Sequence, residues 1–140
     1  MSGYTVASGV LFRQVLEGMS FAYLCSVKTL PFLDTFMKYP NYSTEKSVEQ
    51  LCKRAIAAHV RRDALNTFTK AYDFYHRYAH PTKLTMSAGA NFSMGGVPNI
   101  GPFFDPDKIE EYRKEVRGRI GFTKTLPGTI TGLARNLSEW

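Results

Sequence analysis

A narrow polar stripe runs through an otherwise apolar segment at residues 4–28. Ser8, Arg13, Glu17 and Ser20 recur at helical spacing, and apolar residues fill most other positions of the segment. This pattern predicts a helix that is apolar over most of its circumference. Pro31 should end the helix near Leu30, because the residue before a proline is pushed out of helical geometry.

The segment 44–79 carries a second helical rhythm. Its apolar positions follow a spacing of three or four residues in two runs, Val48, Leu51, Ala55 and Ala58, then Leu65, Phe68, Tyr72 and Tyr75. Ser43 or Thr44 can cap the start of this helix. The polar and β-branched run 59–62 interrupts the rhythm, so we expect either a break or two tightly joined helices there.

A short charged helix is predicted at residues 106–117. Asp105 can cap it, and Pro106 suits the first helical position, where an N–H group has no partner. Gly118 and Gly121 are expected to end it.

The segments 81–104 and 120–140 lack a period of their own and are interrupted by glycine and proline. Both still hold apolar side chains that need cover, so we expect long irregular extended arms. The predicted fold class is mainly α. A helical domain at 1–80 and an arm with one charged helix at 81–140 should form one structural unit.

The length, net charge and cysteine count of the chain limit the classes of protein to which it can belong. The chain has 140 residues, a net charge of +6 and two cysteines, which fits one basic domain and excludes a disulfide-dense secreted scaffold. The first residues do not resemble a secretory signal, and residues 1–30 hold only Arg13 and Lys28 as cations. A mitochondrial address would therefore be internal.

Four cations lie within ten residues of one another: Lys53, Arg54, Arg61 and Arg62. They can bind anionic lipid head groups, of the cardiolipin kind, or an acidic protein surface. Together with Tyr72, Tyr75 and Tyr78 they could instead bind RNA, with the rings stacking on bases. The ordinary alternative is an exposed basic helix face with the tyrosines packed inward.

Gly18, Ala22 and Ser26 form a ladder of small residues on the first helix, which would let another helix approach closely. That helix is long enough to cross a bilayer, but Arg13 and Glu17 would each cost roughly 2.5–3.5 kcal/mol at mid-span. We expect a helix buried against other subunits, in or beside a membrane. A core helix of a soluble domain is the alternative.

No set of residues points to catalysis. Asp73, His76 and His80 share a helical face, but the HExxH pattern of zinc proteases is absent. The glycine-rich run 89–96 lacks the lysine and hydroxyl residue of a phosphate-binding loop. We therefore predict that the protein is not an enzyme and holds no metal and no cofactor.

These features predict a non-catalytic accessory or scaffolding subunit of a large multi-protein assembly. Ordering an irregular arm costs about 1–2 kcal/mol per residue, which contacts with neighbouring chains would offset. Small size, positive charge and the first helix favour a complex of the mitochondrial inner membrane, in the respiratory chain or the ATP synthase. A mitochondrial ribosomal protein on rRNA and a small soluble helical adaptor are the alternatives.

Overall fold

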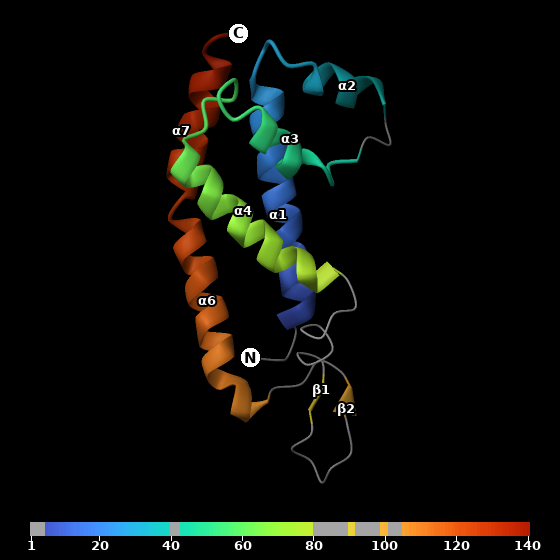
Figure 1. Cartoon of the computed structure of the whole chain (residues 1–140), viewed down its shortest axis with the longest axis vertical. Coiled ribbons are helices and arrows are strands. Elements are labelled where there is room, and N and C mark those ends of the chain that lie inside the picture. Colours follow the sequence, from blue (N-terminus) through green and yellow to red (C-terminus); the bar gives the residue numbers. More distant parts are fainter. Residues whose placement is uncertain (1–4, 40–42, 80–89, 92–98, 101–104) are drawn as a thin grey trace. The chain divides into compact units, whose positions relative to one another are not determined.

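In a computed structural model, the structure describes residues 5–39, 43–79, 90–91, 99–100 and 105–140 (Figure 1). This part of the chain is mainly α-helical, as predicted. Its α-helices are α1 (Thr5–Ser26), α2 (Phe32–Lys38), α3 (Ser47–Lys53), α4 (Arg62–His76), α6 (Ile109–Thr123) and α7 (Leu126–Leu137). Short 3-10 turns follow α4 at Arg77–Ala79 and precede α6 at Pro106–Lys108. The two-residue strands β1 (Ala90–Asn91) and β2 (Asn99–Ile100) pair antiparallel, with Ala90 opposite Ile100.

The chain divides into two compact units. The first unit comprises Met1–Arg13 and Asp73–Lys124, and the second comprises Gln14–Tyr72 and Thr125–Trp140. Each unit therefore combines segments that are distant in sequence. The expected distinction between a domain at 1–80 and an arm at 81–140 stays a prediction.

An aliphatic cluster forms the centre of the second unit. Leu24 of α1 and Val27, which directly follows α1, pack with Leu51 of α3 and with Ala58, which follows α3 in a run of turns. Partly buried side chains surround this cluster: Tyr23, Leu30, Phe32, Val60 and Leu65.

Aromatic rings form the centre of the first unit. The ring centroid of Phe12 lies 4.6 Å from that of Tyr75 and 5.0 Å from that of Phe122, so three helices contribute one ring each. Such offset and edge-on pairs stabilise a core beyond the area that they bury. Asp105 caps the turn before α6, as predicted, by accepting a hydrogen bond from the Asp107 N–H at 3.1 Å.

The first two predicted helical stretches are confirmed in outline. Helix α1 spans Thr5–Ser26, within the predicted range 4–28, and ends before the expected position near Leu30. The predicted stretch 44–79 is broken, because turns at residues 54–59 separate α3 from α4. His59 closes these turns with a φ of 53°, a left-handed conformation that histidine adopts more readily than bulky β-branched residues. The segment between α1 and α3 contains the short helix α2.

The predicted end of the charged helix is wrong. Helix α6 continues through Gly118 and Gly121 to Thr123. Each glycine costs about 1 kcal/mol relative to alanine inside a helix. Contacts of Arg119 and Phe122 with the rest of the first unit offset that cost, since Arg119 bonds to Ser8 and Phe122 packs on Phe12.

The predicted arm at 120–140 is also wrong, because residues 126–137 form helix α7. Pro127 lies in the first turn of α7, where a missing N–H breaks no hydrogen bond. Gly132 lies inside the helix instead of ending it. The other predicted arm, 81–104, falls outside the described residues except for the backbone of β1 and β2.

Candidate interaction surfaces

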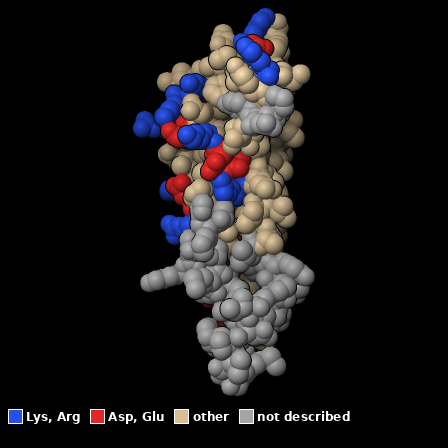
Figure 2. All heavy atoms as spheres, turned by 90° about the vertical axis from the view of Figure 1, so that its right-hand side faces the viewer, with Lys and Arg blue, Asp and Glu red and all other residues tan. Residues whose placement is uncertain are grey.

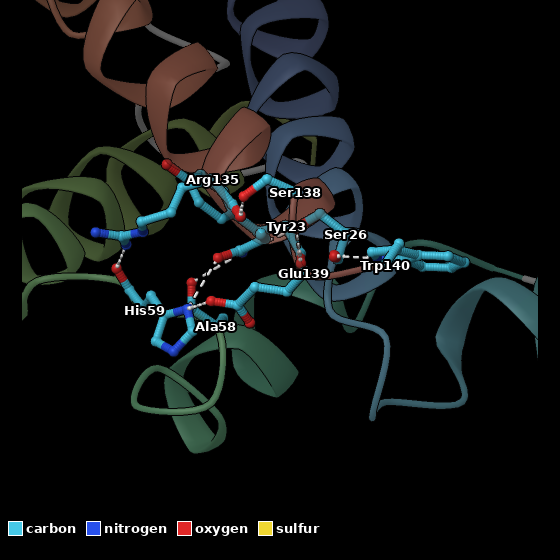
Figure 3. Close-up of polar contacts among 9 residues, drawn as sticks. Tyr23, Ser26, Ala58, His59, Arg135, Ser138, Glu139 and Trp140 are labelled. Carbon is cyan, nitrogen blue, oxygen red and sulfur yellow. Dashed lines mark hydrogen bonds and ion pairs between the residues drawn. The ribbon is translucent and has the colours of Figure 1, made fainter.

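Polar contacts join three segments of the second unit, at Ser26, at Ala58 and His59, and at residues 135–140 (Figure 3). Asn136 of α7 is only 2% exposed. Its side-chain N–H₂ donates to the Ser26 hydroxyl at 3.0 Å and to the Ala58 carbonyl at 3.2 Å. Its side-chain oxygen lies 3.0 Å from Nδ1 of His59. Every hydrogen-bonding group of this amide therefore has a partner, as burial requires.

Further bonds hold the end of the chain beside α1. The indole N–H of Trp140 donates to the Ser26 carbonyl at 2.8 Å, and the Lys28 ammonium donates to the Trp140 carbonyl at 2.7 Å. Arg135 donates to the carbonyl of His59 at 2.8 Å. Helix α7 thus runs along the C-terminal half of α1 as an integral part of the second unit (Figure 1).

Two glycines permit close packing against tyrosine rings. A Cβ atom on Gly9 would lie 2.7 Å from Cγ of Tyr78, and one on Gly132 would lie 2.5 Å from the hydroxyl oxygen of Tyr23. The Tyr23 hydroxyl also donates to the Thr129 carbonyl at 3.2 Å. Both approaches are possible only because glycine has no side chain.

The predicted ladder of small residues has two kinds of environment. Ser26 is buried and bonds to Asn136 and Trp140 within the chain. Ala22 is half-buried, whereas Gly18 is exposed and a Cβ built on it meets no atom within 4 Å. The glycines that pack closely are Gly9 and Gly132, neither of which belongs to the ladder. An intermolecular role of the ladder stays a prediction.

Three of the four predicted binding cations have partners within the second unit. Lys53 forms an ion pair with Glu49 at 2.5 Å, and the hydrogen bond from Lys53 lowers the pKa of Glu49. Arg54 bonds to Gln50 and stacks over Phe32 at 5.3 Å. Ion pairs of this exposed kind contribute at most about 1 kcal/mol.

The other two of these four cations, Arg61 and Arg62, lie at the start of α4. Arg61 donates two hydrogen bonds to Asp63, at 3.1 and 2.7 Å, and these lower the pKa of that carboxyl group. Arg62 is exposed. Figure 2 shows that positive and negative side chains are interspersed on one described face, where Lys and Arg lie beside Asp and Glu. Lipid or acidic-partner binding by Lys53, Arg54, Arg61 and Arg62 stays a prediction.

A carboxylate organises the polar part of the first unit. Glu115 of α6 accepts hydrogen bonds from the hydroxyls of Tyr75 at 3.0 Å and Tyr78 at 3.3 Å, and from Arg119 at 3.2 Å. Arg119 also donates to the Ser8 hydroxyl at 2.7 Å. Burial, with the negative charge of Glu115 added, raises the pKa of both tyrosines.

The tyrosine side chains that could have stacked on RNA bases pack inward or are half-buried. Tyr75 and Tyr78 are buried, so their rings are not available to stack on a base. Tyr72 is half-buried and donates a hydrogen bond to Glu17 at 3.2 Å. Glu17, placed in the polar stripe of α1 by its spacing, is itself buried within the second unit.

The described residues contain no group of three or more His, Cys, Asp and Glu side chains placed to hold a metal ion. Of the predicted set, Asp73 and His76 lie in α4, and His80 is outside the described residues. The glycine-rich run 89–96 is described only in the backbone of β1. Burial raises the pKa of the Cys25 thiol to about 11, so this thiol stays protonated at neutral pH.

Several large apolar side chains remain exposed on regular helices. They recur at helical spacing, as with Ile130 and Leu137 of α7 or Val116 and Ile120 of α6. The exposed residues within helices are Leu11, Val15, Phe36, Met37, Phe74, Ile109, Val116, Ile120, Ile130 and Leu137. Tyr39, Ile56 and Trp140 are also exposed, but they lie outside the helices.

Comparison with protein-family models, with curated proteins and with solved structures finds no match for this chain. Within the described residues, no helix combines the length and the apolar character needed to cross a membrane.

Proposed function

We propose that this protein is a non-catalytic accessory subunit that scaffolds a larger protein assembly. The supporting observation is an uncovered strip, formed by Val15 and Gly18, on the part of α1 that belongs to the second unit. Val15 is 48% exposed, and Gly18, three residues later, leaves open space where a side chain would stand. An exposed apolar residue beside an exposed glycine suits the close approach of a partner helix.

Helix α7 supports the same role with a second surface. Its inward side holds Gly132 and Asn136, whereas Ile130 is 64% exposed and Leu137 is 54% exposed. Both outward side chains are held on a regular helix, so a partner could bury them without first ordering that segment.

The proposed setting is a complex of the mitochondrial inner membrane, in the respiratory chain or the ATP synthase. The net charge of +6 and the helical content favour such a subunit. The charge would equally suit a mitochondrial ribosomal protein bound to rRNA. The hydrogen bonds that Glu115 and Asn136 form within their own units would also suit a small soluble adaptor that folds without partners.

Purification of the tagged chain from its native source in mild detergent tests the proposal. We expect a stable complex that contains other protein subunits in fixed ratio. Recovery of rRNA instead would favour the ribosomal alternative, and a free monomer would favour the soluble adaptor.

A matched pair of variants sharpens this experiment. Gly18→Leu adds a side chain to the exposed strip, and Gly128→Leu adds one to α7 at another glycine that faces open space. A Cβ atom at either position meets no described atom within 4 Å. We expect Gly18→Leu to lose the partner subunits and Gly128→Leu to keep them. Retention of all partners by Gly18→Leu would overturn the assignment of this strip.

A further inference from the structure

Helix α6 separates its side chains into two faces. Tyr112, Glu115, Arg119 and Phe122 recur at spacings of three and four residues, which places them on one side of the helix. All four are buried or half-buried within the first unit. The opposite face of α6 therefore points to solvent.

The solvent face carries cations without anionic partners. Lys114, Arg117 and Lys124 are all exposed, and none of them forms an ion pair or a side-chain hydrogen bond within the described chain. The other two cations of the region differ, because Arg113 pairs with Glu110 and Arg119 pairs with Glu115. From Val116 to Lys124 the sequence contains no acidic residue.

Apolar side chains lie next to these cations. Ile109, Val116 and Ile120 are spaced by seven and four residues, so they form one row along the helix. Each is exposed, and Ile120 is 53% exposed. Ile120 stands three residues after Arg117 and four before Lys124, which places it beside both on the helix surface.

We infer that the outer face of α6 binds the surface of an anionic phospholipid bilayer. Lys114, Arg117 and Lys124 would lie at the level of the lipid phosphates, while Ile120 and Val116 would enter the boundary between head groups and acyl chains. Basic residues bordering an exposed apolar row are the pattern of helices that lie in this interface.

The apolar row distinguishes a membrane from other anionic partners. The phosphates of a nucleic acid attract cations, but they give an exposed isoleucine row nothing to bury against. A bilayer accepts both kinds of side chain at neighbouring depths. The four cations at residues 53–62 belong to the second unit and mostly have partners within it, so they are not part of this surface of the first unit.

Vesicle binding by the purified full-length chain tests this inference, which does not rest on the proposed role as a subunit. The probes are vesicles of phosphatidylcholine alone and vesicles of phosphatidylcholine with phosphatidylserine. We expect binding only to the second kind. The binding should weaken as salt rises, because charges near the surface are screened.

Three variants separate the possible causes of binding. K114Q/R117Q/K124Q removes the three unpaired cations, two in α6 and one directly after it, and K46Q/R62Q/K70Q removes three exposed cations of the second unit for the same change in net charge. At about 1 kcal/mol per cation, the first variant should bind about a hundredfold more weakly. The control should bind nearly as well as the wild type. I120S should bind severalfold more weakly because it removes apolar insertion.

Each outcome decides the inference. Loss in both the α6 variant and I120S, with the control intact, supports a membrane surface. Equal loss in the two triple variants would overturn it in favour of diffuse net charge. Full binding by I120S would overturn it in favour of a purely electrostatic surface for nucleic acid or acidic protein. Absence of binding by the wild type would also overturn it.

Discussion

The two units pack in a similar way, but the polar group at the centre of each unit differs. Each brings a glycine against a tyrosine ring, Gly9 with Tyr78 in the first unit and Gly132 with Tyr23 in the second. In the first unit the central polar group is the carboxylate of Glu115. In the second unit it is the neutral amide of Asn136. A charged centre depends on the donors that compensate its charge, whereas a neutral amide depends on shape and hydrogen bonding alone.

The two units also differ in the kind of apolar side chain that forms their cores. The second unit has a cluster of buried aliphatic side chains around Leu24 and Leu51. The first unit relies on rings that pack around Phe12 and Tyr75. Loss of its central polar group should therefore disturb each unit separately, and the first unit more severely than the second.

Replacing Glu115 by alanine should have the largest effect. The change leaves the Arg119 cation and two tyrosine hydroxyls without their shared acceptor. We expect the free energy of unfolding of the first unit to fall by about 3 kcal/mol. Hydrogen exchange resolved by helix should show loss of protection in α6 and retention in α7.

The control for this change is Glu111→Ala, at an exposed position of the same helix. It should change stability by no more than about 0.5 kcal/mol. An equal loss of protection in α6 and α7 of Glu115→Ala would contradict the separate organisation of the two units.

Replacing Asn136 by alanine should destabilise the second unit by about 2 kcal/mol, because it leaves the buried Ala58 carbonyl without a donor. Denaturant unfolding followed by the fluorescence of the single tryptophan, Trp140, reports on this unit directly. Asn66→Ala, at an exposed position of α4, is the matched control and should unfold like the wild type. Similar midpoints for both variants would show that the amide does not organise the unit.

Two glycines should respond to alanine with opposite sign. Gly9→Ala places a Cβ against the inner atoms of the Tyr78 ring, which cannot swing aside as a flexible chain end can, so we expect a loss of about 1–2 kcal/mol. Gly18→Ala meets no atom and should gain about 0.5–1 kcal/mol from the better helix propensity of alanine. Thermal unfolding of both variants measures the difference, and a stabilised Gly9→Ala would refute the close approach.

The smallest effect on stability at neutral pH is expected from the hydroxyl groups of Tyr75 and Tyr78, which act mainly at alkaline pH. Because the pKa of both Tyr75 and Tyr78 is higher in the folded state than the ordinary value of about 10, their contribution to stability is complete below that pH. It is lost as the pH rises above about 10 toward the folded pKa. Circular dichroism during an alkaline titration should therefore show loss of helix in the wild type.

The double variant Y75F/Y78F should reduce this alkaline loss. Burial also raises the pKa of Tyr23 in the second unit, so Y23F serves as the comparison. We expect Y23F to leave the helix loss of the first unit unchanged. An identical titration for Y75F/Y78F and the wild type would contradict the assignment of the alkaline transition to the first unit.

Periodicity was sufficient for the helices whose apolar residues face inward. Helix α1, the interruption before α4 and the Asp105 cap could all be predicted from local spacing and capping chemistry. Helix α7 was missed because Pro127 and Gly128 resemble a turn, although proline is tolerated in a first helical turn. Its inward positions at spacings of three and four, Leu126, Thr129, Leu133 and Asn136, carry the signal that could have revealed it.

The polar centres could not be predicted from sequence. Glu115 stands in a run of charges typical of a solvated helix face, and nothing local marks it as the acceptor for two tyrosines from a distant segment. Asn136 bonds to residues 78 and 110 positions away. Such contacts depend on tertiary packing, as does the choice of which glycine meets a ring.

Site-specific photocrosslinking in the native cell tests most directly whether this protein completes its surface with other proteins. A photoreactive residue at Val15 of the exposed strip is compared with one at Asn66, also exposed and in the same unit. We predict one crosslinked product of defined mass from position 15 and none from position 66. Crosslinking at neither position, or equally at both, would contradict a specific subunit contact on helix α1.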